Sequence, residues 1–395
     1  MSDLRYLREL DDAQLEAFVG VAAAAFAVDV DAARAWIDAA GRELVRAVSL
    51  DGRVVGGLLF IPMGQCFGGR SVPMLGLAGV CVAMDQRRRG VAQRMLRATL
   101  DEARERGLAL STLYASNHKL YGSVGYAPAG SRFLARLDPS AVDPRLSSGP
   151  LRAASAQDYP VVEALYGAAA ARTPGFLDRG GYIWPRVRET RRGLTAHGLL
   201  LLDEDSGEPC GYVYVRLRSE GEWQVLEITD AVAADAATWR RVWGAVNSVG
   251  TMVRRIEWSS APHDPLYLAL EHARAELRLH ENWMLRVVDA RGALEARGYA
   301  SALSLSIDVE LHDDGRDAER LHLEVSAGGA RCSTSSASVA PSVRLDARGL
   351  AALYSGFAAP ALLRQRGLLE GGDAAADEAL GALFAGPAPW MREAF

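Results

Sequence analysis

The sequence predicts an α/β (α+β) fold in which one helix-and-strand unit occurs twice and a smaller domain follows. Three observations predict it. A strand of buried character enters an amphipathic helix through a basic, glycine-containing turn between Val80 and Leu96. A similar order of helices and strands returns between Ala156 and Trp258. From Leu303 onward, alternating strands come before helices, which is typical of an α+β domain.

The bulk composition is that of an ordinary globular protein. The 395 residues are 49% hydrophobic and 24% charged, with a net charge of −5. The chain is therefore long enough for about two or three domains and a substantial core. A nucleic-acid-binding face usually produces a basic excess, so the mild acidity disfavours nucleic acid as a partner and suits a cationic substrate.

Nothing in the sequence predicts export or a membrane span. The first residues, MSDLRYLRELDDAQ, carry charges where a signal peptide needs an apolar core. No apolar run approaches the roughly 20 residues of a membrane helix. The cysteines lie far apart and form no CxxC pair, which is typical of reduced thiols: Cys66, Cys81, Cys210 and Cys332. We therefore expect a cytoplasmic protein that does not associate with membranes.

The first elements alternate between helices and strands. The alanine-rich segment Asp12–Phe26 is predicted to be helical, and a second helix is predicted around Asp31–Ala40, which carries Trp36. Asp51-Gly52 is a strong hairpin signal and separates two strand-like segments. Gly68-Gly69 marks a further turn. The predicted strands are Glu43–Leu50, Arg53–Phe60, Ser71–Val82 and Leu108–Ala115.

The turn after Val82 has the features of an anion site. Three arginines, Arg87 to Arg89, precede Gly90, and the helix that follows ends at Gly107. Its apolar face is formed by Val91, Met95, Leu96, Thr99, Leu100 and Ala103. First-turn N–H groups lack partners within a helix, and glycine lets an anion approach them. The alternative is an exposed arginine run at a solvated helix start. The form Arg87-x-x-Gly90-x-Ala92 resembles the pyrophosphate loop with which GNAT N-acetyltransferases bind acetyl-CoA.

A second segment, Ser116 to Pro128, reads SNHKLYGSVGYAP. Its glycines restrict any helix to a short turn around Lys119 to Val124. The run from Leu120 to Tyr126 resembles a second GNAT signature. When an amine attacks a thioester a thiolate leaves, and a nearby phenol can protonate it, so Tyr121 is a candidate general acid. The alternative is that Tyr121 only packs.

After a linker at Asp138–Pro150, the order of elements repeats. The predicted helices are Ala156–Ala171, Arg186–Arg192 and one capped by Asp235; the predicted strands are Gly198–Asp203, Gly211–Leu217, Trp223–Thr229 and Ile256–Trp258. Where the first copy has arginines and glycine, this copy has Ala231-Val232-Ala233-Ala234-Asp235. An acidic cap is a poor neighbour for a pyrophosphate, so we expect this copy to keep the fold and lack the cofactor.

In the last region, the sequence predicts strands, then helices, and then a C-terminal tail that packs against the protein. The strands are Leu303–Val309, Arg320–Ser326 and Ala330–Thr334, with a turn at Asp313-Asp314-Gly315, and the helices are about Asp346–Ser355 and Ala375–Phe384. Frayed tails are commonly polar, whereas this tail offers Trp390, Met391 and Phe395 as apolar anchors. We expect the tail to dock, although ordinary sealing of a core explains it equally well.

Over the whole chain this arrangement, with LEARGYA at Leu294–Ala300, resembles the enhanced-intracellular-survival (Eis) acetyltransferases. The resemblance implies a GNAT domain at 1–140, a GNAT-like domain without a cofactor loop at 150–290, and a sterol-carrier-protein-like domain at 291–395. It also implies a homohexamer. The implied activity moves acetyl from acetyl-CoA to amines of aminoglycosides, polyamines or lysine side chains, with no metal.

The resemblance also implies roles for individual residues. Strand residues Val80, Cys81 and Val82 would bind the pantetheine, and Ser116 and Asn117 would lie beside the thioester. The pyrophosphate would be held by Arg88, Arg89, Gly90, Val91, Ala92 and Gln93. Tyr121 matches the general acid. The α-carboxylate of Phe395 matches the proton acceptor, acting through water because its reference pKa of roughly 3.5 makes it a weak direct base.

For the acceptor, the resemblance implies Trp36 as a pocket aromatic and Asp29 or Glu393 as a negative charge that attracts an ammonium. The family pattern ends in an acidic and then an aromatic residue. This chain ends Glu393-Ala394-Phe395, which displaces the carboxylate by one position. The difference bears on the breadth of antibiotic substrates more than on acetyl transfer itself.

Other classes of function have weaker support. The histidines form no HExxH motif, His312-Asp313-Asp314 is predicted as a turn, and there is no GxSxG. Gly64-x-x-x-Gly68-Gly69 lacks the Lys-Ser/Thr of a P-loop. Two alternatives remain. One is a lipid-carrying or scaffold protein in which the GNAT-like domains are architectural, and the other is an acetyltransferase dedicated to one metabolite or protein lysine.

Overall fold

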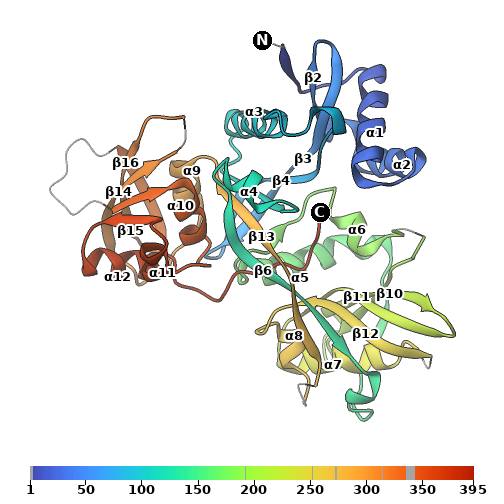
Figure 1. Cartoon of the computed structure of the whole chain (residues 1–395). Helices are drawn as coiled ribbons and strands as arrows, with labels where there is room; N and C mark the ends of the chain where they lie inside the picture. Colours follow the sequence, from blue (N-terminus) through green and yellow to red (C-terminus); the bar gives the residue numbers. More distant parts are fainter. Residues whose placement is uncertain (1–2, 192, 251, 272–273, 314, 335–342) are drawn as a thin grey trace. The chain divides into compact units, whose positions relative to one another are not determined.

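The computed structural model describes residues 3–191, 193–250, 252–271, 274–313, 315–334 and 343–395. Figure 1 shows the course of the chain, which forms two compact units. Unit 1 comprises Met1–Ala129, Trp283–Ala388 and Phe395, and unit 2 comprises Gly130–Asn282 and Pro389–Ala394. Two strands, β6 (Ala127–Leu137) and β13 (Glu276–Val287), contribute residues to both units. The first and last thirds of the sequence therefore belong to the same unit.

The first sheet of unit 1 has the strand order β1-β2-β3-β4-β5-β13. Its strands are β1 (Leu4–Leu7), β2 (Val45–Leu50), β3 (Arg53–Phe67), β4 (Arg70–Val82), β5 (Leu110–Tyr114) and the end of β13. The strand predicted from Glu43 begins later because Arg42–Leu44 form a 3-10 turn. The strand β13, which pairs antiparallel with β5, was not predicted.

Two-residue turns connect β2 to β3 and β3 to β4. In the first, Asp51 and Gly52 have φ of 49° and 84°, and Leu50 pairs with Arg53. In the second, Gly68 and Gly69 have φ of 61° and 89°. Positive φ at both central positions matches the right-handed twist of a hairpin. Both predicted turns are confirmed.

The helices of this part of unit 1 are α1 (Asp12–Phe26), α2 (Val30–Ala40), α3 (Val91–Glu105), α4 (His118–Gly122) and α9 (Ala290–Ala296). The whole predicted apolar face of α3 is buried. It packs into a core that includes Leu58, Phe60 and Leu75. Glu102, on the same helix, is also buried, and its charge is balanced by Arg46, whose Nη2 lies 2.9 Å from Oε1.

A second sheet in unit 1 is formed by the last third of the chain, with the order β16-β15-β14-β17-β18. Its elements are β14 (Leu305–His312), β15 (Glu319–Ser326), β16 (Gly329–Thr334), β17 (Val343–Asp346), β18 (Leu369–Gly371), α10 (Ala347–Tyr354), α11 (Pro360–Gln365) and α12 (Ala374–Leu383). The predicted succession of strands and then helices is confirmed, although β17, β18 and α11 were not predicted. The predicted turn at 313–315 includes residue 314, which lies outside the described residues.

Unit 2 contains the strand order β12-β11-β10-β9-β7, with the end of β6 paired to β12. Its elements are β7 (Leu151–Ala153), β8 (Leu177–Asp178), β9 (His197–Leu202), β10 (Pro209–Glu220), β11 (Trp223–Ala233), β12 (Val253–Ser260), α5 (Tyr159–Ala171), α6 (Trp184–Arg188), α7 (Ala236–Asn247) and α8 (Pro265–Leu268). Strands β11 and β12 are parallel and are joined through α7, so this unit repeats the strand-helix-strand order of β4, α3 and β5.

One predicted helix in unit 2 has different limits. The prediction covered Arg186–Arg192, but α6 spans Trp184–Arg188, and residue 192 lies outside the described residues. Pro185 in the first turn suits a helix start because proline lacks the N–H that would be unpaired there. Glu189 already has extended backbone, with ψ of 179°, so the helix ends before it.

Within the described residues, no single helix is long and apolar enough to cross a membrane. The consecutive helices α1 and α2 meet the criteria of length and composition only as a pair, and they bend by 116° at the break.

Candidate active site

The site begins where β4 separates from β5. The two strands pair in parallel from Met74 with Leu110 to Gly76 with Thr112. Beyond Gly76, β4 continues to Val82 while paired with β3 on its other side. In the described part of the chain, the edge of β4 that faces β5 therefore has no strand partner over Val80–Val82. Such an edge can accept an extended amide chain by main-chain hydrogen bonds.

A β-bulge in β4 precedes this edge. On β3, Gly57 pairs with Cys81 and Leu59 with Ala78, so Gly79 and Val80 together face the single residue Leu58. Gly79 has φ of +61°, a conformation that favours glycine. Bulges bend the strand that carries them and increase its twist. The bulge follows shortly after the last pair between β4 and β5, and it was not predicted from the sequence.

The basic turn leads directly to the N-terminus of α3. Gly90 is the N-cap residue, with φ of +74°, and no side chain caps the helix. Arg88 has φ of +61°, a rare conformation for a residue with a side chain. Arg87, Arg88, Arg89 and Gly90 are all exposed. The N–H groups of the first turn are therefore free of a capping side chain, beside three positive charges.

The space in front of this turn suits a diphosphate. A Cβ atom built on Gly90 would meet no atom within 4 Å, so the backbone there is open. Further into the first turn, Gln93 Nε2 donates to Ser123 Oγ at 3.3 Å, which connects α3 to the end of α4. Exposed helix N–H groups, glycine and cations are the groups that bind phosphates at helix N-termini. The segment from Arg88 to Gln93 thus fits the pyrophosphate that the family resemblance implies.

Tyr121 lies on α4 and is buried, with 5% of its surface exposed. Its ring packs edge-on against Tyr126, with ring centroids 6.0 Å apart. Burial raises the pKa of the Tyr121 phenol to about 12, and the nearby Cys81 thiol on β4 adds to the shift. The phenol thus keeps its proton at neutral pH, beside the strand predicted to bind pantetheine.

Ser116 and Asn117 connect β5 to α4. Both are exposed, and Asn117 is the N-cap residue of α4, where its Oδ1 accepts a hydrogen bond from the N–H of Leu120 at 3.1 Å. The cap sets where the short helix begins, since an N-cap side chain satisfies a free N–H group of the first turn. Tyr121 follows one residue after Leu120, so the position of Asn117 helps to determine where Tyr121 lies.

The C-terminal residue lies at the point where β4 and β5 separate. The ring of Phe395 contacts Tyr114 of β5 edge-on, with centroids 6.0 Å apart. A Cβ atom built on Gly76 would lie 3.0 Å from Cε2 of Phe395, so the ring occupies the space that this glycine leaves. Tyr114 and Gly76 both belong to unit 1, as does Phe395 itself.

The residues just before Phe395 are held in unit 2. Trp390 is buried and packs edge-on against Phe176 at 4.8 Å between centroids. Glu393 is buried, and its Oε1 accepts a hydrogen bond from Arg179 Nε at 2.6 Å. Arg179 also binds Asp230 at 2.6 Å. Burial alone would raise the pKa of Asp230, but the charges of Arg179 and Arg392 hold it at about 2. The tail is therefore docked.

Of the three residues predicted to contact the acceptor, Trp36 lies against β4. The indole of Trp36 contacts the position where Gly79 would carry a Cβ atom, and it meets the ring of Phe26 edge-on at 6.2 Å. Asp29 is exposed and caps α2, accepting from the N–H of Ala32 at 2.7 Å. The charge of Glu393, in contrast, is balanced by Arg179.

Comparison with known proteins agrees with this geometry. Residues 6–129 and 175–287 each match a model described as an acetyltransferase (GNAT) domain, and residues 290–392 match a sterol carrier protein domain. An uncharacterized N-acetyltransferase of Streptomyces avermitilis is 32% identical over 352 residues, which cover 83% of each chain. The chain belongs to the GNAT N-acetyltransferases of the Eis type.

Two further relatives of this Eis-type enzyme span nearly its whole length. The N-acetyltransferase Eis of Mycobacterium bovis is 29% identical over 394 residues, covering 93% of this chain and 94% of the relative. The crystal structure of a GCN5-related N-acetyltransferase from Anabaena variabilis superposes with a TM-score of 0.92 and 28% identity, covering both chains completely. The predicted fold class, two GNAT domains followed by a sterol-carrier-like domain, is confirmed, and so is the prediction of an acetyltransferase.

GNAT acetyltransferases use acetyl-CoA, and the first GNAT domain of this Eis-type chain has the groups that would bind it. At β4 and α3, within the described residues, an unpaired strand edge, an uncapped helix N-terminus and an open N-cap glycine occur together. In the second GNAT domain, Asp235 caps α7 and its Oδ1 accepts from the N–H of Thr238 at 2.7 Å. The carboxylate of Asp235 already accepts an N–H group of this helix N-terminus, and its negative charge would repel an anion there. No group of three or more possible metal ligands occurs within the residues that the structure describes.

Proposed function

We propose that the chain transfers acetyl from acetyl-CoA to a primary amine of a cationic acceptor, such as an aminoglycoside, a polyamine or a lysine side chain. The observation that supports this most directly is the unpaired edge of β4, which ends at the uncapped N-terminus of α3. In one continuous stretch the chain offers main-chain groups for an amide chain and N–H groups with positive charge for a diphosphate.

Each predicted cofactor residue has a role in this proposal. The edge formed by Val80, Cys81 and Val82 hydrogen-bonds to the pantetheine amides. The pyrophosphate is held by Arg88, Arg89, Gly90, Val91, Ala92 and Gln93. Ser116 and Asn117 border the reacting end. When bound, acetyl-CoA supplies the acetyl group as an activated thioester.

The proton transfers are assigned to two groups. As the amine nitrogen bonds to the acetyl carbon, the carbon–sulfur bond breaks, and the hydroxyl of Tyr121 donates its proton toward the sulfur. The nitrogen loses a proton through water to the α-carboxylate of Phe395. Because a terminal carboxylate with a reference pKa of roughly 3.5 is a weak base, the acceptor amine must itself lose basicity in a partly dry site. Burial of Tyr121 keeps its proton available at neutral pH.

For the acceptor we propose that Trp36 forms one wall, and that Asp29 attracts the ammonium before it is deprotonated. Glu393 was predicted as an alternative source of negative charge. Its ion pair with the buried Arg179 supports a different role, in which Glu393 holds the tail and the approach of the acceptor depends on Asp29. The net charge of −5 is in keeping with a cationic acceptor.

A thiol-release assay tests the proposal. Acetyl-CoA is incubated with the protein and a panel of polyamines, aminoglycosides and lysine peptides, and the acetylated product is identified by mass spectrometry. In parallel, thermal unfolding is followed with acetyl-CoA and with a fatty acid. Thiol release that depends on an amine, with protection by acetyl-CoA, supports the proposal. Protection by the fatty acid alone, without thiol release, would indicate a lipid carrier.

Assembly, location and domain limits stay predictions. We propose a homohexamer and a cytoplasmic protein without nucleic-acid or membrane partners, with domain limits at 1–140, 150–290 and 291–395. Light scattering coupled to size-exclusion chromatography measures the mass of the assembly directly. A mass of one 42.4 kDa chain would contradict the hexamer.

A further inference from the structure

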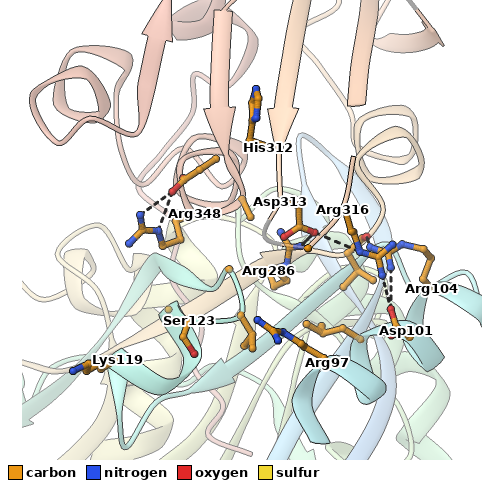
Figure 2. Close-up of a pocket in the computed structure, with 18 of the residues that line it drawn as sticks. Arg97, Asp101, Arg104, Lys119, Ser123, Arg286, His312, Asp313, Arg316 and Arg348 are labelled. Carbon is orange, nitrogen blue, oxygen red and sulfur yellow. Dashed lines mark hydrogen bonds and ion pairs between the residues drawn. The ribbon is translucent and has the colours of Figure 1, made fainter. Parts of the chain in front are cut away.

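A large pocket in unit 1 lies outside the proposed acetyl-transfer site. Figure 2 shows its lining, which comes from α3 and α4 on one side and from β13, the end of β14 and the start of α10 on the other. Its volume is about 780 Å³, which lies within the range of about 300–1,000 Å³ typical of small-molecule sites. None of the residues assigned to the proposed reaction lines this pocket, although one lining residue, Ser123, accepts a hydrogen bond from Gln93.

The lining carries a surplus of positive charge. Six side chains with a permanent positive charge face three carboxylates: Arg97, Arg104, Lys119, Arg286, Arg316 and Arg348, against Asp101, Asp313 and Asp346. Arginine suits the binding of phosphate or carboxylate because its planar guanidinium donates to two oxygens at once. Three positive charges are therefore left over in one concave surface.

The carboxylates are already engaged within the protein. Asp313 binds Arg286 and also lies 3.7 Å from Arg316. Asp101 lies 3.4 Å from Arg104 and also pairs with Arg316. Asp346 binds Arg348 at 2.8 Å and accepts from the N–H of Gly349 at 2.6 Å, where it caps α10. Figure 2 marks ion pairs of this set. Among the described residues, Arg97 and Lys119 have no ion-pair partner.

Arg286 gives the pocket a buried donor without a partner. Arg286 belongs to β13, and only 5% of its surface is exposed. Its Nη2 binds Asp313, but its Nε has no hydrogen-bond partner within the described residues. A Cβ atom built on Gly125, another lining residue, would lie 2.9 Å from that Nε. A buried guanidinium with an unsatisfied N–H is costly unless an acceptor reaches it.

The cations also repel one another. Burial lowers the pKa of Arg104, and the positive charges of Arg316 and Arg286 lower it further. A bound anion would relieve this repulsion. The unsatisfied Nε of Arg286 and the mutual repulsion of the arginines both favour a bound anion.

We propose that this pocket binds a small polyanion with three or more negative charges clustered on phosphate or carboxylate oxygens. Such a ligand fits the three surplus charges and the available volume. It would contact α3 and α4, which carry the proposed cofactor turn and Tyr121, and at the same time β13 and α10 of the last third of the chain. A ligand here would hold those elements together.

Acetyl-CoA is itself a polyanion, so the test must separate the two sites. Arg97 and Arg104 lie seven and fourteen residues after Gly90 on the same helix, which at 1.5 Å per residue is roughly 10 and 20 Å along its axis. We therefore expect a polyanion to bind the pocket while CoA occupies the β4 edge.

The experiment is a calorimetric titration of the full chain with inorganic tripolyphosphate, in the presence of saturating CoA. The double variant R316A/R348A removes two half-exposed arginines of the lining, and R254A removes an exposed arginine of unit 2 as the matched control. We expect saturable binding that weakens by roughly tenfold or more in the double variant, with CoA affinity within about twofold of the parent and R254A unchanged. Citrate in place of tripolyphosphate distinguishes a carboxylate ligand from a phosphate ligand.

Three results would overturn the proposal. The first is the absence of saturable binding by either anion. The second is competition of tripolyphosphate with CoA, or an equal loss of CoA affinity in R316A/R348A, because the pocket would then be part of the cofactor site. The third is an equal loss of anion binding in R254A, which would indicate non-specific attraction to a basic surface.

Discussion

The ring of Phe395 lies over Gly76, the last residue of β4 that pairs with β5. A glycine at this position leaves room for the ring, and the strand edge that we propose for the cofactor begins just beyond it. The C-terminal residue is thus placed at the level where the two strands separate.

The first test changes the glycine under Phe395. In Gly76→Ala the new methyl group would overlap the end of the Met63 side chain and would lie 3.0 Å from Cε2 of Phe395, so both side chains must shift. We expect the displaced ring to lower kcat by about tenfold to a hundredfold, since small misplacements of reacting groups cost that much. The Kd for acetyl-CoA should stay within about twofold. Gly20→Ala, on α1 with open space around it, is the control and should leave both values unchanged.

The second test extends the chain. One residue added after Phe395 moves the α-carboxylate away from the position that it now holds. We expect a loss of turnover of about 100-fold, a typical contribution of a general base. A one-residue extension at the N-terminus controls for the change in length. Full activity of the C-terminally extended protein would rule out the terminal carboxylate as the proton acceptor.

The third test removes the proposed general acid. Tyr121→Phe should lower kcat by about 100-fold or more while acetyl-CoA still binds, because only the proton donor is lost. Tyr126→Phe is the matched control: it removes a buried hydroxyl that lies 2.7 Å from Ser111 Oγ. That change should cost about 1 kcal/mol of stability and leave turnover nearly intact. Unchanged turnover in Tyr121→Phe would remove Tyr121 from the mechanism.

The fourth test uses pH. The raised pKa of about 12 keeps the proton on Tyr121 at lower pH, so kcat at saturating substrates should not fall between pH 7 and about pH 10.5. The same shift affects stability. An unfolded tyrosine releases its proton near pH 10, so the stabilising contribution of Tyr121 is complete below that value and is lost as pH rises toward 12. A decline in kcat centred near pH 10, absent in Tyr121→Phe, would show that the phenol titrates as an ordinary tyrosine.

The fifth test concerns the cofactor turn. Gly90 caps the start of α3 with φ of +74°, and Gly107 follows the end of the helix with φ of +71°. A Cβ atom on either glycine would meet no atom within 4 Å. Alanine at either position should therefore cost a similar conformational energy, roughly 1–2 kcal/mol. We expect only Gly90→Ala to weaken acetyl-CoA binding, by about tenfold, because its methyl group restricts the approach of the diphosphate. Calorimetry with CoA distinguishes the two, and equal affinities would contradict the proposed loop.

Much of the fold could be predicted because its signals are local. The α1 helix has the predicted limits, Asp12 and Phe26, and the Asp51-Gly52 hairpin has the backbone that its two residues favour. The strands β6 and β13 were missed. Their pairing partners are far away in the sequence, since Trp283 of β13 pairs with Tyr114 and Phe133 of β6 with Ser260.

The candidate site also has parts that the sequence predicted and parts that it did not. The basic turn and the apolar tail were found from spacing and residue type, and Tyr121 from the resemblance of its segment to a GNAT signature. The bulge at Gly79, the fit of Phe395 to Gly76 and the ion pair of Glu393 with Arg179 were not. Each joins residues from different segments, and no neighbouring residue in the sequence indicates its partner. Arg286, within a strand that was not predicted, gave no signal of the cationic pocket.

By itself the sequence determined the local features of this protein: a helix start with glycine and arginines, a tyrosine in a short glycine-bounded turn after it, and an apolar end. Those features depend on backbone preferences and on the period of apolar residues, both of which act over a few neighbours. The tertiary structure alone decided where β4 leaves β5, what lies beside the C-terminus and which charges share a pocket. Contacts of that kind form only when distant segments pack together, so their partners are selected by the whole fold rather than by adjacent residues.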